Sequence, residues 1–259
     1  MNPTNITPDN DRLARCGIPE IIYGEIKTDF EIFCAMCEIL KRSKSAIATR
    51  VSREKSRQVT RRLEDYKNEN GIECSIRYDD ISGVMIAEIK EEIGIKGEVE
   101  IKSEFENKDE VKNLIENSKI NKNKITRKIG ILTAGTSDAR VAREAEIIAK
   151  QLGCEVYARY DVGIAGIHRV FDALEEMSDL DIGVYIVVAG MEGALPSVVA
   201  GLVREVVIGV PTSVGYGTGK GGTAALNTML NSCTPVCCVN IDNGLGAALI
   251  AYKILKGRQ

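Results

Sequence analysis

The stretch IGILTAGTSD, residues 129–138, decides how the fold is read. Its apolar start predicts a buried strand, and a helical pattern follows at once, with Ser137 or Asp138 as its N-cap. The exposed face of that helix is predicted to carry Arg143, Glu144 and Glu146. A helix that begins at the carboxyl end of a strand presents free N–H groups and its positive dipole end. The stretch therefore predicts either a site for phosphates or carboxylates, or an ordinary turn that binds nothing.

The second half of the chain repeats this strand-then-helix pattern five times. Strands are predicted over residues 129–133, 155–159, 182–188, 206–209 and 236–241. Helices are predicted to begin near Asp138, Gly166, Ala194, Gly221 and Leu245. The strands are apolar without alternation, which is typical of strands covered on both faces. With right-handed crossovers, the pattern predicts an α/β fold, a doubly wound parallel sheet of the flavodoxin type.

The first half of the chain predicts a small α+β domain. We expect short strands at 21–23 and 45–51, a helix that begins at Asp29, and a polar helix from Ser52 to about Asn68. Two further strands are predicted at 73–78 and 83–89. Residues 90–124 are rich in Lys, Glu and Asn, which indicates a solvated linker or, alternatively, an interaction segment. The predicted domains are therefore residues 1–124 and 125–259.

Composition excludes several classes of function. The 259 residues carry a net charge of −3, 5% aromatic residues and no Trp, which argues against a nucleic-acid partner. No apolar run reaches the length of a membrane span, and residues 1–11 do not resemble a signal peptide, so a cytoplasmic location is expected. The eight cysteines are expected to be reduced, and a single His excludes a His-rich metal site.

Four glycine-rich loops follow the predicted strands at 160–169, 189–197, 211–222 and 242–244. In doubly wound sheets, ligands bind beyond the carboxyl ends of the strands. Glycine recurs where the backbone must approach a ligand closely or adopt a positive φ. Because four such loops meet at one edge of one sheet, that edge is the predicted site.

Three loops that follow the predicted strands carry Thr136-Ser137-Asp138, Ile167-His168-Arg169 and an Ala-Gly-x-x-x-x-Leu-Pro pattern over 189–196. In these motifs the chain resembles the AIR carboxylase family, whose members move CO2 on and off a purine precursor. One residue departs from the family pattern. Where the purine enzymes carry a histidine just before Leu-Pro, this chain has Ala194, and Glu192 stands two residues earlier.

Further motifs are RCGIPEIIYGEIKT (15–28), AIATRV (46–51), VPTSVGYGTGKGG (210–222), LNSCTP (230–235) and VNIDNG (239–244). These segments resemble the LarB family of nickel-pincer cofactor biosynthesis. The resemblance implies nicotinic acid adenine dinucleotide as substrate and CO2 or bicarbonate as co-substrate, with no tightly bound organic cofactor. It implies carboxylation of the pyridinium ring at C5 and hydrolysis of the phosphoanhydride, which releases AMP. It also implies a homo-octamer with sites between subunits.

Carboxylation of an electron-poor pyridinium ring requires a nucleophile that first adds to the ring, and a thiolate is suited to this step. We therefore expect Cys233 to be the nucleophile. Glu192, Asp161 and His168 remain alternative bases for removing the ring proton. The residues predicted to bind the substrate are Gly135, Thr136, Ser137, Asp138, Arg169, Gly190, Met191, Ser213, Gly215, Lys220, Asp242 and Asn243. Mg2+ is a candidate ion for the phosphoanhydride step, with Asp138, Asp161 and Asp242 as candidate ligands.

Two other functions remain open at this stage. The first is a purine-type carboxylase or mutase that acts on an aminoimidazole ribonucleotide. The second is a non-catalytic nucleotide-binding or scaffold protein. We expect the N-terminal domain to cover the site or to contact the adenosine half of the substrate. Its polar motif to test is Ala-Thr-Arg, which ends at Arg50.

Overall fold

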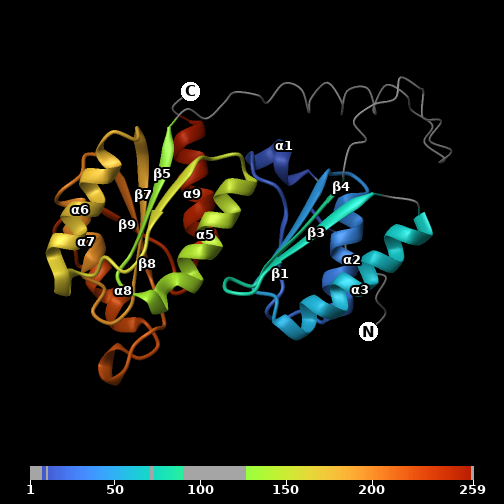
Figure 1. Cartoon of the computed structure of the whole chain (residues 1–259), viewed down its shortest axis with the longest axis horizontal. Coiled ribbons are helices and arrows are strands. Elements are labelled where there is room, and N and C mark those ends of the chain that lie inside the picture. Colours follow the sequence, from blue (N-terminus) through green and yellow to red (C-terminus); the bar gives the residue numbers. More distant parts are fainter. Residues whose placement is uncertain (1–7, 10, 71–72, 90–126, 258–259) are drawn as a thin grey trace.

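The computed structural model of the chain describes residues 8–9, 11–70, 73–89 and 127–257 (Figure 1). The predicted linker at 90–124 and the boundary between residues 124 and 125 lie outside these ranges. The described residues form two units, each built on its own sheet.

The N-terminal unit has a four-stranded sheet in the order β1-β2-β4-β3, with β1 and β2 parallel and the other pairs antiparallel. Its strands are β1 (Ile21–Tyr23), β2 (Ser45–Thr49), β3 (Cys74–Asp79) and β4 (Val84–Ile89), and its helices are α1 (Arg12–Cys16), α2 (Asp29–Leu40) and α3 (Arg53–Asn70). Helix α2 begins with a capping box, in which the Thr28 side chain accepts from the Glu31 N–H and Glu31 accepts from the Thr28 N–H. The predicted α+β elements are confirmed here, within one to two residues at their ends.

The C-terminal unit is a parallel five-stranded sheet in the order β6-β5-β7-β8-β9. Its strands are β5 (Lys128–Thr133), β6 (Val156–Arg159), β7 (Ile182–Ala189), β8 (Val206–Pro211) and β9 (Val236–Cys238). Its helices are α5 (Ala139–Gln151), α6 (Ile167–Ser178), α7 (Leu195–Ala200), α8 (Thr223–Leu230) and α9 (Gly244–Lys256), with 3-10 turns η2 (Thr136–Asp138), η3 (Ile164–Gly166) and η4 (Gly217–Gly219). Every residue of β7 is buried, as expected for a strand covered on both faces. The doubly wound α/β fold is confirmed, although β9 ends at Cys238 rather than at the predicted Ile241.

Helices α5 and α9 lie between the two sheets, and both sheets pack against them (Figure 1). Ile47, Val84 and Ile86 of the N-terminal sheet share one core cluster with residues of β5, α5, β7 and α9. On the other face of the C-terminal sheet, α6, α7 and α8 cover a separate core. The N-terminal unit is therefore packed onto the C-terminal one through α5 and α9.

This packing corrects the prediction for helix α5. Glu144 and Glu146, expected on an exposed face, are 3% and 8% exposed, whereas Arg143 is half-buried. The helix pattern indicates only that these side chains are polar. It carries no information about the elements that cover these side chains. Each buried carboxylate is instead paired, Glu144 with Thr49 and the Leu245 N–H, and Glu146 with Lys150 and Tyr160.

The Glu146 carboxylate should make the free energy of unfolding depend on pH in the acidic range. Burial acts to raise its pKa, but hydrogen bonds from Lys150 and Tyr160 and the nearby charges lower the pKa below the ordinary value of 4.5. A lowered folded-state pKa contributes stability above the unfolded pKa, and this contribution is lost as pH falls through the folded pKa. We expect Glu146→Gln to lose less unfolding free energy than the wild type between about pH 5 and pH 3. Urea denaturation at each pH measures this difference.

The exposed Glu175 of α6 offers a matched control for that experiment. Glu175→Gln should follow the wild-type acid dependence. If Glu146→Gln follows it as well, the carboxylate makes no such contribution.

Candidate active site

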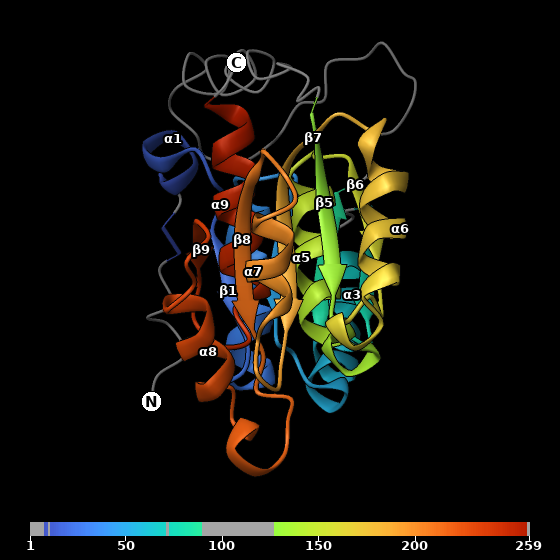
Figure 2. The ribbon, with the colours of Figure 1, turned by 90° about the vertical axis from the view of Figure 1, so that its left-hand side faces the viewer.

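All five loops that follow the parallel strands are joined by hydrogen bonds at the carboxyl edge of the sheet. The Asp161 N–H donates to Thr133 Oγ1 (3.0 Å), which joins the β6 loop to the end of β5. The Met191 N–H donates to the Val214 carbonyl (3.1 Å), which joins the β7 and β8 loops. The Asp242 N–H donates to the Pro211 carbonyl (2.8 Å), which joins the β9 loop to the end of β8. In Figure 2 the strands point downward, and the orange β8 loop extends beyond their ends.

Asp138 is the buried centre of this edge, at 4% exposed. Its Oδ1 accepts from Thr212 Oγ1 (2.7 Å), its Oδ2 accepts from the Gly135 N–H (2.9 Å), and the backbone of Gly190 donates to it as well. Burial raises the pKa of Asp138, and these hydrogen bonds offset only part of that effect. Asp138 is the N-cap residue of α5, as predicted, but its side chain makes no capping hydrogen bond to the helix. It ties together the loops that follow β5, β7 and β8.

Thr136 and Ser137 are exposed in η2, immediately before α5, and the half-buried Gly135 precedes them. The positive end of α5 therefore lies beside two exposed hydroxyl groups. This combination suits an anionic group such as a phosphate or a carboxylate.

The β7 loop is packed tightly against the β8 loop. Gly190 has no room for a side chain, because a Cβ there would lie 2.3 Å from the Val214 carbonyl oxygen. Met191 adopts the left-handed region at φ 52°, and the next residue, Glu192, is exposed. The tight packing thus positions the Glu192 carboxyl group at the surface of the edge.

The β6 loop carries a charged pair. Arg169 Nη1 donates to the Asp161 carbonyl oxygen (2.6 Å) and lies 3.0 Å from Asp161 Oδ2. Asp161 is exposed at φ 60°, and His168 is exposed in the first turn of α6. The structure therefore brings Asp161 and Arg169 together, with His168 on the same helical turn as Arg169.

Asp242 and Asn243 form the turn that leads into α9. Asp242 Oδ1 accepts from the Ser213 N–H (2.8 Å), and Asn243 Oδ1 accepts from the Gly246 N–H (2.8 Å), which caps α9. In the β8 loop, Lys220 follows η4 and is exposed, and Gly215 is half-buried. Asp242 and Ser213 are thus in direct contact, whereas the side-chain oxygen of Asn243 is used to cap helix α9.

Cys233 lies apart from these loops within one subunit. It is exposed in the connection between the C-terminal end of α8 and the N-terminal end of β9. The residue after it, Thr234, donates through Oγ1 to the Ser197 carbonyl of α7 (2.9 Å). Since α8 runs back from the carboxyl edge, the thiol lies toward the amino ends of the strands, beside the edge strand β9. The role of Cys233 stays a prediction, and in one chain the other predicted residues do not surround it.

The candidate magnesium ligands do not form an ion site of their own. Asp138 accepts through both oxygens, Asp161 is paired with Arg169, and Asp242 accepts from Ser213. In the part of the chain that the structure describes, no three His, Cys, Asp or Glu side chains are placed to hold a metal ion together. Mg2+ at the phosphoanhydride stays a prediction.

Sequence reasoning missed two residues that shape the site. Thr212 is completely buried and binds Asp138, and its position directly after the β8 strand was the available signal. Glu144 reaches the first turn of α9 through the Leu245 N–H (3.0 Å), and no pattern in the chain indicates this contact.

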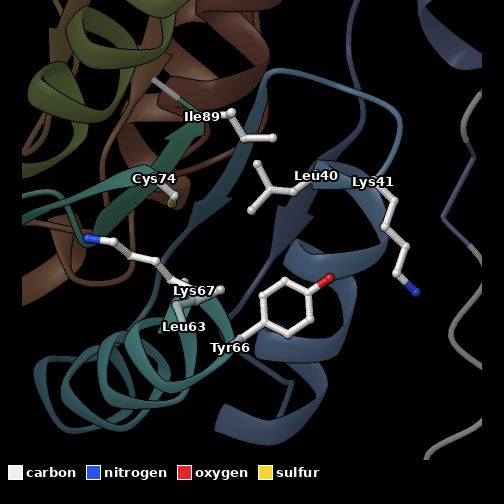
Figure 3. Close-up of a pocket in the computed structure, with 7 residues that line it drawn as sticks. All are labelled: Leu40, Lys41, Leu63, Tyr66, Lys67, Cys74 and Ile89. Carbon is white, nitrogen blue, oxygen red and sulfur yellow. The ribbon is translucent and has the colours of Figure 1, made fainter. Parts of the chain in front are cut away.

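A pocket in the N-terminal unit lies away from this site (Figure 3). It opens between α2, α3 and the ends of β3 and β4, and is lined by Leu40, Lys41, Leu63, Tyr66, Lys67, Cys74 and Ile89. Its lining is mostly aliphatic and contains none of the predicted site residues.

None of the described helices combines the length and apolarity needed to cross a bilayer.

Two family models match the chain. The AIR carboxylase model matches residues 128–259, which include all five strands of the parallel sheet. The model of the LarB/PurE-like N-terminal domain matches residues 4–88. An uncharacterized protein of Methanocaldococcus jannaschii is 40% identical over 249 residues, covering 96% of this chain and 83% of that protein.

Other relatives match about half of this chain. The N5-carboxyaminoimidazole ribonucleotide mutase of Methanocaldococcus jannaschii is 34% identical over 129 residues, covering 49% of this chain and 78% of the mutase. The crystal structure of Treponema denticola PurE is 26% identical, with a TM-score of 0.42, and covers 51% of this chain and 81% of that structure.

Proposed function

The chain belongs to the AIR carboxylase family, and from this premise we propose that it carboxylates the pyridinium ring of nicotinic acid adenine dinucleotide at C5. We also propose that it hydrolyses the phosphoanhydride with one water molecule, and that the two reactions together give AMP and pyridinium-3,5-biscarboxylic acid mononucleotide. The observation that carries the proposal is the pairing of this family's domain with a LarB/PurE-like N-terminal domain in one chain. Ala194 supports it, because the histidine expected there in purine-type enzymes is absent.

The proposed chemistry begins with the Cys233 thiolate. The thiolate adds to a ring carbon conjugated with the positive nitrogen, and the ring becomes a neutral enamine. The electron-rich C5 attacks CO2, a C–C bond forms, and the ring becomes an iminium. A base removes the C5 proton and restores the enamine, and expulsion of the thiolate restores the aromatic pyridinium ring. One CO2 is added and one proton is released.

The base remains one of Glu192, Asp161 and His168, all exposed at the carboxyl edge. Glu192 is free of the pairing with Arg169 that occupies Asp161. Arg169 and the hydroxyl groups before α5 suit the phosphates, because they offer charge and hydrogen-bond donors together.

An assembly of several copies is part of this proposal. In one chain Cys233 lies apart from the five loops. The proposal therefore requires the thiol of one subunit to complete the site formed by the loops of another. Two exposed leucines support a covered surface here: Leu230, three residues before Cys233, is 65% exposed, and Leu202, after α7, is 47% exposed.

The reaction is tested by incubating the purified protein with nicotinic acid adenine dinucleotide and 13C-bicarbonate. We expect mass spectrometry to show a dicarboxylated mononucleotide that carries one 13C atom, together with AMP. Parallel reactions with aminoimidazole ribonucleotide and its N5-carboxy derivative test the purine-type alternative, which the mutase relative favours. Turnover of only those ribonucleotides would replace our proposal. Binding of the dinucleotide without any product would indicate a non-catalytic protein.

Subunit mixing tests the shared site. Cys233→Ala and Asp138→Asn should each be inactive alone. If each site combines two subunits, random mixing of the two variants should restore about a quarter of wild-type sites, because half the subunits supply each intact part. Co-expression with two affinity tags, followed by the labelled-bicarbonate assay, measures this. A mixture as inactive as its components would show that both residues act within one subunit.

A further inference from the structure

Two N-terminal segments that the proposed chemistry does not use, residues 15–28 and 46–51, meet around Arg50. Arg50 Nη1 donates to the Tyr23 hydroxyl (2.5 Å), which in turn donates to Glu25 Oε2 (2.8 Å). The guanidinium carbon lies 4.9 Å from the centroid of the Tyr23 ring, a cation–π contact. These contacts hold the Arg50 side chain in one orientation.

In that orientation Arg50 reaches the C-terminal unit. Its Nη2 donates to the carbonyl oxygen of Asp242, and its Nε lies 3.6 Å from Glu144 Oε1. Glu144 also accepts from Thr49 Oγ1, and its second oxygen accepts from the Leu245 N–H (3.0 Å). The turn before α9 is therefore held at both ends, at Asp242 by Arg50 and at Leu245 by Glu144.

The backbone of this turn is unusual. Asp242 adopts φ 57°, a left-handed conformation that residues other than Gly, Asn and Asp rarely adopt. The same residue accepts from the Ser213 N–H, so its position also sets the start of the β8 loop. The Arg50 side chain is only 16% exposed, so water competes weakly for the bond to Asp242.

We propose that Arg50 is a positioning residue that holds the Asp242 turn, and through it Ser213, in the geometry that binds substrate. The N-terminal unit is then a structural part of the active site rather than a separate module. The kinetic part of this inference rests on the proposed function. The geometric part does not.

The test compares Arg50→Gln with Arg143→Gln. Arg143 also crosses between the units, with its Nε 3.2 Å from Asp79 Oδ1, but it does not touch the Asp242 turn. Hydrogen exchange followed by mass spectrometry reports on peptides that cover residues 211–216 and 240–246. We expect Arg50→Gln to exchange about tenfold faster in both peptides and Arg143→Gln to match the wild type there, because a charged donor to a poorly exposed carbonyl is lost only in the former.

Kinetics with nicotinic acid adenine dinucleotide and bicarbonate give the second readout. Arg50→Gln should raise KM for the dinucleotide about tenfold or more and change kcat much less, since binding geometry is disturbed and not the thiol. Arg50→Lys, which keeps the charge near Glu144, should recover part of the loss.

Unchanged exchange in Arg50→Gln, or equal changes in both arginine variants, would overturn the inference and leave Arg50 as ordinary interface. If the wild type does not act on the dinucleotide, the proposed function fails, and the exchange data alone decide whether Arg50 holds the turn.

Discussion

Replacing Cys233 with alanine is expected to lower carboxylation of nicotinic acid adenine dinucleotide by at least about 1,000-fold, because no other group would start the reaction. Without the thiol, the ring stays cationic, and C5 carries too little electron density to attack CO2. The side chain is exposed and its loss leaves no cavity in the core, so the fold should be retained. Incorporation of label from 13C-bicarbonate into the mononucleotide measures the loss, and circular dichroism checks the fold.

Cys237 provides the matched control. It is also an exposed free cysteine, it lies four residues further on in β9, and the proposed chemistry does not use it. Cys237→Ala should carboxylate at the wild-type rate. A Cys233→Ala protein that still incorporates label would remove the first step of the proposed reaction, and both the thiolate and the composite site would have to be abandoned.

Replacing Asp138 with alanine is expected to have the largest effect on stability among residues of the carboxyl edge. The change leaves the Thr212 hydroxyl and the backbone N–H groups of Gly135 and Gly190 without their acceptor in a buried place. A buried donor without a partner costs about 1–3 kcal/mol, so we expect a loss of about 3 kcal/mol or more in the free energy of unfolding. Carboxylation should fall as well, because three loops lose their common anchor. Urea denaturation and the labelled-bicarbonate assay measure the two effects.

Asp138→Asn tests the contribution of the carboxylate charge to stability, because the asparagine side chain can still accept a hydrogen bond but cannot ionise. Burial raises the pKa of Asp138 above its ordinary value of 3.8. A raised folded-state pKa contributes stability below the unfolded pKa, and this contribution is lost as pH rises through the folded pKa. The asparagine does not titrate, so its stability relative to the wild type should improve between about pH 4 and pH 7. A constant difference across that range would show that the carboxylate is not destabilised by burial.

Much of the fold could be predicted because its signals are local. Unalternated apolar strands, each followed by a helix pattern, indicate a parallel sheet wherever they occur, and β7 is buried along its whole length. Parallel strands all end at one edge, so the loops after them were predicted to meet, and hydrogen bonds such as Thr212 to Asp138 join them. Ser137 or Asp138 was predicted as the helix cap, and Asp138 holds that position. Its contact with Thr212, 74 residues away, could not be predicted, because the position of Thr212 after β8 places it at the same edge of the sheet but does not pair it with Asp138.

The amino-acid sequence by itself determined the α+β and α/β patterns, the loops at the carboxyl edge and the residue types they carry, since periodicity and glycine placement act over a few neighbouring residues. Only the tertiary structure decided three further points. It buried Glu144 against Thr49 of the N-terminal sheet, joined Arg50 to the Asp242 turn, and placed Cys233 away from the loops of its own chain. Each depends on how two sheets pack across α5 and α9, or on the direction in which α8 returns. Such relations join residues far apart in the chain, so local patterns cannot specify them.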